Sequence, residues 1–400
     1  MRSYSADLLQ RQQQQLYRRR RVVTRISACE VEVEGQAAIN FCSNDYLGLA
    51  DHPQLVRALQ DGAEQYGVGS GAAHLVSGHT PVHHRLEERL AELSGYPRAL
   101  CFGSGYLANL ALVTALARRG DRLLQDRLNH ASLYDGALLS RAKLCRYDHA
   151  DPAAAERLLQ QGGAELLVTD GVFSMDGDIA PLPQLADLAQ RYRFRLVVDD
   201  AHGFGLLGPK GAGTIAHFGL GEAEVPIWMA TLGKAVGCSG AFIAANDELI
   251  ETIIQNGRSY IYTTAPPPAI AAATLVALDL VQREEGRRQR LQQLIERFRR
   301  GMMQLGYPLL PSSTAIQPVV VGESGQAMAM SEALLEHGLL VSAIRPPTVP
   351  AGSARLRVTL SAAHSDEALE RLLAAFDTLS RGGWQQDPIV SGETVCHPLP

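Results

Sequence analysis

Short apolar runs alternate with amphipathic stretches along the middle of this chain, from about residue 51 to 285. The apolar runs have the length of buried strands, and apolar residues recur at helical spacing in the stretches between them. Examples of both kinds are ELLVTD (165–170), FRLVVDD (194–200), PIWMATL (226–232), LEERLAELSG (86–95) and LPQLADLAQRY (182–192). Strands that alternate with helices predict a parallel sheet covered by helices on both faces.

The pattern differs on both sides of this region. Residues 5–20 predict a Gln- and Arg-rich helix without a strong apolar face, and residues 22–42 predict short strands. A long charged amphipathic helix begins near residue 285. The segments after it are predicted, in order, as strand, helix, strand, strand and helix: 317–321, 325–337, 339–343, 354–360 and 365–380.

The chain is therefore predicted to have four parts. Residues 1–50 form an N-terminal helix and short strands, and residues 51–285 form a large α/β domain. Residues 286–385 form a small α+β domain, and residues 386–400 form a loose tail.

Composition and charge narrow the class of protein. The 400 residues are 46% hydrophobic and 20% charged, which is typical of a globular protein with a large core. A net charge of -5 gives no basic excess, so we expect no nucleic acid or membrane partner. The most apolar run, 269–278, is shorter than the roughly 20 residues of a membrane helix. The six cysteines include no CxxC pair, which predicts buried, reduced thiols in a cytoplasmic protein, without a metal site.

Charged residues at two predicted strand ends are the first sign of chemistry. The strand in FRLVVDDAHGFG ends at Asp199, with His202 three residues later, and Lys234 follows another strand in the Gly-rich turn TLGKAVGCSG. Ligands bind at the carboxyl ends of parallel strands, and a lysine in such a turn has little structural purpose. Either residue alone is most simply a surface charge. Together they fit pyridoxal 5'-phosphate, which needs a lysine for its Schiff base and a carboxylate that keeps its pyridine nitrogen protonated.

Two glycine-rich segments are candidates for binding phosphate. GSGYLANLALVTALA (103–117) is a turn that opens a helix, and the free N–H groups at a helix N-terminus attract anions. GVGSGAAH (67–74) lacks the preceding strand and the glycine spacing of a dinucleotide fingerprint. We therefore interpret GVGSGAAH as a flexible loop near the substrate.

Two further positions follow apolar runs. His130 comes after RLLQD, although a lone histidine is more often structural than catalytic. Ser174 comes after ELLVTD, at the carboxyl end of that predicted strand. The acids Asp176 and Asp178 beside it are interpreted as turn formers.

Over roughly residues 16–382 the chain resembles the α-oxoamine synthases, a family of fold-type I pyridoxal-phosphate enzymes. The motifs that carry the resemblance are FCSNDYLGLA, SGHTPVHHRLE, DRLNHASLYDG, GVFSMDGDIAPL, DDAHGFG, TLGKA and IRPPTVPAGSARLRVTLSAAH. The resemblance implies an α/β fold-type I PLP-dependent transferase, with a large parallel-sheet domain and a small C-terminal α+β domain. Members of the family condense glycine, alanine or serine with an acyl thioester and release carbon dioxide.

The resemblance also implies roles around the cofactor. Lys234 would hold the cofactor and move the substrate's α-proton, and Asp199 would pair with the pyridine nitrogen. His202 would contact the ring hydroxyl. His130 would lie over the ring face opposite the lysine and contact the substrate. The remaining cofactor contacts, three of them at the phosphate end, would come from Gly105, Tyr106, Thr231 and Ser174.

Substrate contacts are implied at four more positions. Arg357, helped by Asn44, would grip the amino-acid carboxylate, a task that suits the bidentate geometry of arginine. Thr348 and Arg18 match substrate-contacting positions, although the basic run at 18–21 allows a shift in register for Arg18.

The choice of substrates and partners rests on two segments. IRPPTVP (344–350) favours members that join L-alanine to a pimeloyl thioester, carried by acyl carrier protein or coenzyme A, in biotin biosynthesis. The alternatives are members that make aminolevulinate or 2-amino-3-ketobutyrate. Tyr262 and Thr263 resemble the loop by which one subunit reaches the phosphate of its neighbour, which implies a homodimer with shared active sites.

The sequence argues against two other functions. A nicotinamide-dependent oxidoreductase could use an α/β sheet, but the chain has no strand–GxGxxG–helix unit. A fold-type I protein that has lost its lysine could act only as a binding partner. The presence of Lys234 with a supporting acid and histidines argues against that role.

Overall fold

The computed structural model describes residues 4–382, so the predicted tail at 386–400 lies outside the described residues. The chain divides into two compact units. The large unit contains Leu47–Ser174 and Asp178–Arg288. The small unit contains the residues up to Tyr46, the short segment Met175–Gly177 and the residues from Gln289 onward. The small unit is thus assembled from both ends of the chain.

The large unit is built on a seven-stranded sheet. Its strands, in spatial order, are β4 (Arg98–Phe102), β10 (Ala241–Ala245), β9 (Ile227–Thr231), β8 (Arg195–Asp199), β7 (Leu166–Asp170), β5 (Arg122–Asp126) and β6 (Lys143–Tyr147). The three strands predicted from ELLVTD, FRLVVDD and PIWMATL are β7, β8 and β9. The predicted parallel sheet is in fact mixed, because β10 runs antiparallel to both of its neighbours. The chain between β9 and β10 is too short for a crossover, so it must turn back on itself.

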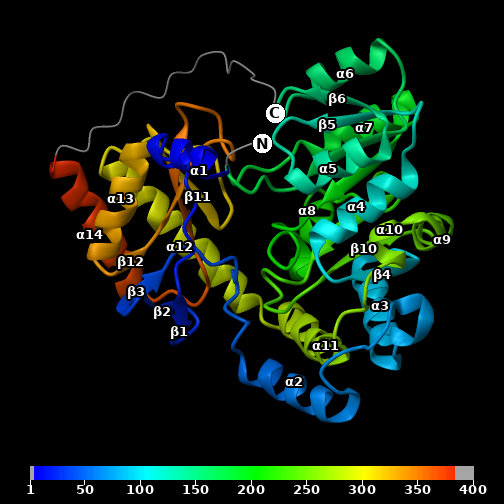
Figure 1. Ribbon diagram of the computed structural model, residues 1–400, viewed down its shortest axis with the longest axis horizontal. Helices are drawn as coiled ribbons and strands as arrows, with labels where there is room; N and C mark the ends of the chain where they lie inside the picture. Colours follow the sequence, from blue (N-terminus) through cyan, green and yellow to red (C-terminus); the bar gives the residue numbers. More distant parts are fainter. Residues whose placement is uncertain (1–3, 383–400) are drawn as a thin grey trace. The chain divides into compact units, whose positions relative to one another are not determined.

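Helices lie on both faces of the sheet. The helices of the large unit are α2 (Pro53–Tyr66), α3 (Pro81–Ser94), α4 (Gly105–Leu116), α5 (Ala131–Ser140), α6 (Pro152–Gln160), α7 (Leu182–Tyr192), α8 (Gly213–His217), α9 (Asp247–Asn256), α10 (Arg258–Ile261) and α11 (Pro268–Arg283), with the short π-helix η1 (His74–Gly78) and the short 3-10 helix η2 (Pro209–Gly211). In β7, Leu166 and Val168 join a core cluster with α4 and α5, which lie beside each other in Figure 1. Leu167, which points the opposite way, is equally buried, as expected for a strand covered on both sides.

The small unit contains two short sheets. One has the order β1 (Val23–Arg25), β2 (Glu30–Val33), β3 (Gln36–Asn40) and β12 (Leu339–Leu340), and the other has the order β11 (Ile316–Gly322), β14 (Ala354–Thr359) and β13 (Ser342–Ile344). Its helices are α1 (Tyr4–Gln13), α12 (Glu285–Gln304), which begins in the large unit, α13 (Ser324–Glu336) and α14 (Asp366–Arg381). After residue 315 the order of elements is the predicted one, except that two strands replace the single strand predicted over 339–343.

Two predicted elements of the small unit differ from the structure. The N-terminal helix, predicted over 5–20, ends at Gln13, and Gln15 adopts a left-handed conformation with φ 57° that a helix cannot continue through. The strand predicted over 339–343 is two strands. Its first half, β12, pairs in parallel with β3, and its second half, β13, pairs antiparallel with β14.

Two predictions from composition can be compared with the described residues. No helix in 4–382 is long and apolar enough to cross a membrane. The cysteines in this range form no disulfide bonds. Cys29 and Cys101 are buried, as expected, but the others are only partly buried: Cys42, Cys145 and Cys238.

Candidate active site

A pocket of about 160 Å³ lies in the large unit, where β7, β8 and β9 end and α4 and α5 begin. This position follows from the parallel sheet, because the carboxyl ends of its strands meet at one edge. Eight of the residues predicted from the sequence line this pocket: Gly105, Tyr106, His130, Ser174, Asp199, His202, Thr231 and Lys234. The pocket is also lined by Asn109, Asp170, Val172, Ala201 and Met229.

Lys234 stands in the turn between β9 and β10. Its Nζ lies 2.6 Å from Nε2 of His202, which is only 7% exposed. Thr231, the last residue of β9, donates its hydroxyl to the carbonyl of Gly240 at 2.9 Å and closes the base of the turn. Gly237 has φ 73°, and a Cβ there would lie 2.7 Å from the backbone nitrogen of Ala50, so this turn requires glycine. The turn therefore holds the lysine in a fixed place beside a buried histidine.

The two adjacent acids after β8 face in different directions. Asp199 lines the pocket, accepts the Ala201 N–H at 3.0 Å and is 4% exposed. Asp200 instead accepts the Thr214 N–H at 2.7 Å and the hydroxyl of the same threonine. Burial raises the pKa of Asp200 to about 7, and the bonds from Thr214 oppose that rise. Asp200 is thus a structural acid, and Asp199 is the acid available to a ligand.

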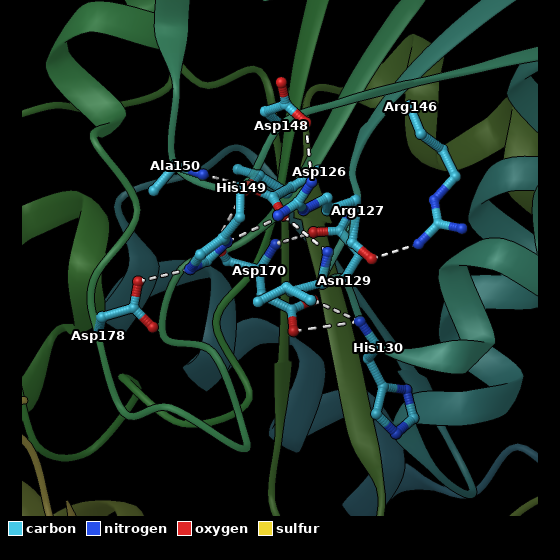
Figure 2. A network of polar contacts seen from close by, with 12 residues as sticks. Asp126, Arg127, Asn129, His130, Arg146, Asp148, His149, Ala150, Asp170 and Asp178 are labelled. Carbon is cyan, nitrogen blue, oxygen red and sulfur yellow. Dashed lines mark hydrogen bonds and ion pairs between the residues drawn. The ribbon is translucent and has the colours of Figure 1, made fainter. Parts of the chain in front are cut away.

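His130 lies at the N-terminus of α5 and is held there through its backbone. Its N–H is 3.2 Å from both carboxylate oxygens of Asp170, at the end of β7, as Figure 2 shows. Asn129 fixes the same loop, because its side chain accepts the N–H of Asp170 at 3.0 Å and donates to the carbonyl of Val168 at 2.8 Å. Burial, together with the nearby charge of Asp199, raises the pKa of Asp170 well above its usual range.

A second polar group, centred on His149, helps to fix the same loop. His149 contacts Asp126 through Nδ1 at 3.0 Å and Asp178 through Nε2 at 2.9 Å (Figure 2). Burial alone would lower the pKa of His149, but its hydrogen bonds to the two carboxylates raise it to about 9. Asp126 also accepts the N–H groups of Leu128 and Ala150. A cation at this position therefore ties the loop before His130 to the loop after β7.

The N-terminus of α4 provides an anion site at the pocket. The Ser104 side chain caps the N–H of Leu107, and the Ser104 carbonyl accepts the N–H of Ala108 at 3.0 Å. The earlier helical amides, those of Gly105 and Tyr106, have no intrahelical acceptor and border the pocket. They can bind a phosphate group with the help of the helix dipole.

These groups fit pyridoxal phosphate. The amine of Lys234 could form a covalent bond, and two buried carboxylates, those of Asp199 and Asp170, line the same pocket. Asp170 is occupied by the backbone N–H of His130. The helix N-terminus at Gly105 supplies the donors that a phosphate requires. Outside the pocket, His79, His84 and Glu87 could together hold a metal ion, but the two histidines are exposed.

In the small unit, Arg357 and Asn44 come together. The two terminal nitrogens of Arg357 lie 3.2 and 3.3 Å from Oδ1 of Asn44, and one of them donates to the hydroxyl of Thr359 at 2.9 Å. Tyr46 also donates its hydroxyl to Asn44. Burial raises the pKa of Tyr46, and the positive charge of Arg357 opposes this rise. Arg357 as a whole is 7% exposed, and its guanidinium is held by Asn44 and Thr359.

Arg18 and Thr348 both lie near Arg345. The side chain of Arg345 donates to the carbonyls of Gln15 and Tyr17 and so attaches the segment that carries Arg18. Burial lowers the pKa of Arg345, and the positive charge of Arg18 lowers it further. The N–H of Thr348 donates to the Arg345 carbonyl at 3.1 Å, and both Arg18 and Thr348 are exposed.

The structure gives four residues contacts that the sequence analysis did not predict. Asp176 and Asp178 are not merely turn formers, because Asp176 forms an ion pair with Arg355 and Asp178 forms one with His149. Asn109 and Asp170 line the pocket but were not singled out. Asn109 is a polar residue in an otherwise apolar helix, and Asp170 ends a strand as Asp199 does, so both signals were present in the sequence.

Comparisons with known proteins give the family of the chain. Residues 36–376 match the family described as aminotransferase class I and II. The chain is 57% identical over 372 residues to an 8-amino-7-oxononanoate synthase of Pseudomonas putida, a match that covers 93% of this chain and 95% of the relative.

Two solved structures are also similar. One is an 8-amino-7-oxononanoate synthase from Francisella tularensis, 33% identical, with a TM-score of 0.76 and coverage of 87% of this chain and 99% of that one. The other is a serine palmitoyltransferase from S. paucimobilis with a bound PLP–myriocin aldimine, 28% identical, with a TM-score of 0.90 and coverage of 94% and 96%.

Proposed function

Because the chain belongs to the α-oxoamine synthases, within the aminotransferase class I and II family, we propose that it joins L-alanine to a pimeloyl thioester in biotin biosynthesis. The products are 8-amino-7-oxononanoate, carbon dioxide and a free thiol. Like its fold-type I relatives, the enzyme uses pyridoxal 5'-phosphate. The observation that supports this chemistry best is the pocket that gathers Lys234, Asp199, His130 and His202 beside the N-terminus of α4.

Pyridoxal phosphate supplies an electron sink for the negative charge that develops on the α-carbon of alanine. Lys234 would hold the cofactor covalently, and its Nζ would then remove the α-proton. Asp199 would keep the pyridine nitrogen protonated by its charge, and His202 would bind the ring hydroxyl. Gly105, with three further residues, would hold the phosphate end and the rest of the cofactor: Tyr106, Thr231 and Ser174.

The other residues orient the substrates. Arg357, fixed by Asn44, would bind the carboxylate of alanine, while His130 would contact the substrate over the ring. Thr348 and Arg18 would contact the acyl substrate. A carbon–carbon bond forms between the α-carbon and the thioester carbonyl as the carbon–sulfur bond breaks and the thiol leaves. The carboxylate then leaves as carbon dioxide, and a proton returns to the α-carbon.

The test is a matrix of substrates. Release of carbon dioxide and thiol is measured with alanine, glycine or serine against pimeloyl, acetyl, succinyl and palmitoyl thioesters. We expect alanine with pimeloyl to be preferred, with glycine reacting slowly, because one methyl group discriminates by only about 1–3 kcal/mol. Preference for succinyl with glycine, or acetyl with glycine, would instead support an aminolevulinate or 2-amino-3-ketobutyrate synthase. Pimeloyl bound to acyl carrier protein is compared with pimeloyl coenzyme A to identify the carrier.

We also propose that the enzyme is a cytoplasmic homodimer with shared active sites. The support is the likeness of Tyr262 and Thr263 to a loop that reaches the neighbouring subunit, and Tyr262 is 71% exposed with Arg258 stacked on its ring at 4.8 Å. A mixture of Lys234→Ala chains with Thr263→Val chains tests the sharing. If the sites are shared, hybrid dimers contain one intact site and activity returns on mixing. If mixing restores nothing while hybrid dimers form, the sites are not shared.

A further inference from the structure

A continuous chain of hydrogen bonds connects Asp199 to the ring of His130. The side-chain nitrogen of Asn109 lies 2.7 Å from Oδ2 of Asp199 and 2.8 Å from Oγ of Ser132. Oγ of Ser132 lies 2.7 Å from Nδ1 of His130. Asn109, Ser132 and Asp199 are 1%, 0% and 4% exposed, so bulk water does not compete for these bonds.

The chemistry of the groups fixes the direction of each bond. An ionised carboxylate only accepts hydrogen bonds, so Asn109 must turn its NH₂ group toward Asp199. The second hydrogen of that NH₂ group then points to Oγ of Ser132. The backbone N–H of Ser132 can only donate, and it points to Nδ1 of His130 at 3.3 Å, so Nδ1 is an acceptor. The hydroxyl of Ser132, which also faces Nδ1, therefore directs its own hydrogen to the same nitrogen.

The orientation of Asn109 has a second indication. Its Oδ1 is buried and has no hydrogen-bond partner among the described residues. Leaving a buried acceptor unpaired is unfavourable. The opposite orientation would place this oxygen against the carboxylate of Asp199 and would remove the donors from both Asp199 and Ser132. The carboxylate therefore determines which way the amide faces.

We infer that Asn109 and Ser132 are positioning residues that hold His130 as the neutral tautomer with its proton on Nε2. Nδ1 accepts from two donors and cannot carry a proton without losing both. Burial lowers the pKa of His130, the charge of Asp199 opposes this, and Lys234 lowers the pKa again, in keeping with a neutral ring. His130 thus offers an N–H donor rather than a base to an oxygen of the substrate. This last consequence rests on the proposed function, whereas the tautomer itself does not.

The inference is tested by magic-angle-spinning NMR of holoenzyme labelled with ¹³C and ¹⁵N in histidine. The chain has twelve histidines, and the signals that vanish in His130→Gln identify the ring of His130. We expect the nitrogen shifts of a neutral ring protonated at Nε2 in the wild type. In Ser132→Ala the fraction protonated at Nδ1 should rise about five-fold, the effect of losing one ordinary hydrogen bond. Ser132→Thr, which keeps the hydroxyl, should restore the wild-type signal.

A matched control separates positioning from packing. Ser140 is a second buried serine on α5, and its hydroxyl donates to the Ala137 carbonyl and accepts the Ala142 N–H, with no contact to His130 among those described. Ser140→Ala should leave the His130 signals unchanged. A wild-type ring protonated at Nδ1, or a Ser132→Ala ring still protonated only at Nε2, would overturn the inference. Neither result depends on which substrates the enzyme accepts, so a failure of the proposed function is seen separately in the substrate assays.

Discussion

The ion pair around His149 predicts how the stability of the enzyme changes with pH. The pKa of His149 is about 9 in the folded chain, against an ordinary value of 6.5. A raised pKa stabilises the folded state fully below pH 6.5, and the contribution is lost as pH rises through 9. With these two pKa values, the proton on His149 adds about 3 kcal/mol to the free energy of unfolding at pH 6. At pH 9 it adds well under about 1 kcal/mol. The His149 side chain is 20% exposed, so solvent screening reduces this stabilising contribution only in part.

His149→Gln keeps a hydrogen-bonding side chain between Asp126 and Asp178 but removes the charge. For a chain of this length, about 3 kcal/mol corresponds to a fall of about 4 °C in Tm at pH 6. Any loss of packing is the same at every pH. The diagnostic quantity is therefore how much the difference in Tm between wild type and His149→Gln changes from pH 6 to pH 9. Thermal unfolding of the holoenzyme followed by circular dichroism measures it. His84→Gln is the control, because His84 is an exposed histidine whose contact with Glu88 is solvated.

The reasoning is refuted if the difference in Tm between wild type and His149→Gln is the same at pH 6 and pH 9. That result would mean that His149 is neutral in the folded enzyme and that Asp126 and Asp178 do not hold a cation. A difference that grows with pH would contradict the sign of the linkage.

Three further changes test the proposed site. Lys234→Ala should abolish turnover and the yellow colour of tightly held cofactor, while the exposed Lys143→Ala should alter neither; near-normal product formation by Lys234→Ala would remove the basis of the mechanism. Asp199→Asn should keep the fold and the cofactor but slow exchange of the alanine α-proton in D₂O at least ten-fold, because an opposite charge within about 4 Å shifts a pKa by one unit or more; undiminished exchange would assign Asp199 another role. Thr348→Ala should lower kcat/KM without bleaching the cofactor absorbance, and unchanged kinetics with pimeloyl thioester would remove Thr348 from the substrate site.

Local sequence patterns predicted most of the fold. The strands β7, β8 and β9 were found because each is a short apolar run that ends in a polar residue. The reversed direction of β10 was missed, because AFIAA is apolar in either direction and periodicity carries no information about strand polarity. The split between β12 and β13 was missed for a similar reason, since residues 339–343 form one short run without a turn residue and only the pairing partners reveal the break.

The sequence predicted the site only in part, and the reason differs from the one for the fold. Asp199 and Lys234 could be chosen from the sequence because each follows a strand, and strand ends meet at one edge of the sheet. Asp176 and Asp178 looked like turn residues because their partners, Arg355 and His149, are far away along the chain. The role of Asn109 depends on a bond to Asp199, ninety residues later. Partners at such separations are set by tertiary structure, which local patterns do not contain.

The small unit also constrains the order in which a newly made chain can fold. Its strand β3 is synthesised near the start, but Ile39 pairs with Leu339 of β12, close to the end. At about 5–20 residues per second, the ribosome needs roughly 15–60 s to make the intervening chain. The residues of the large unit all emerge within this interval and can fold first. Until β12 has been made, strand β3 keeps an unpaired edge, and such an edge can pair with other chains.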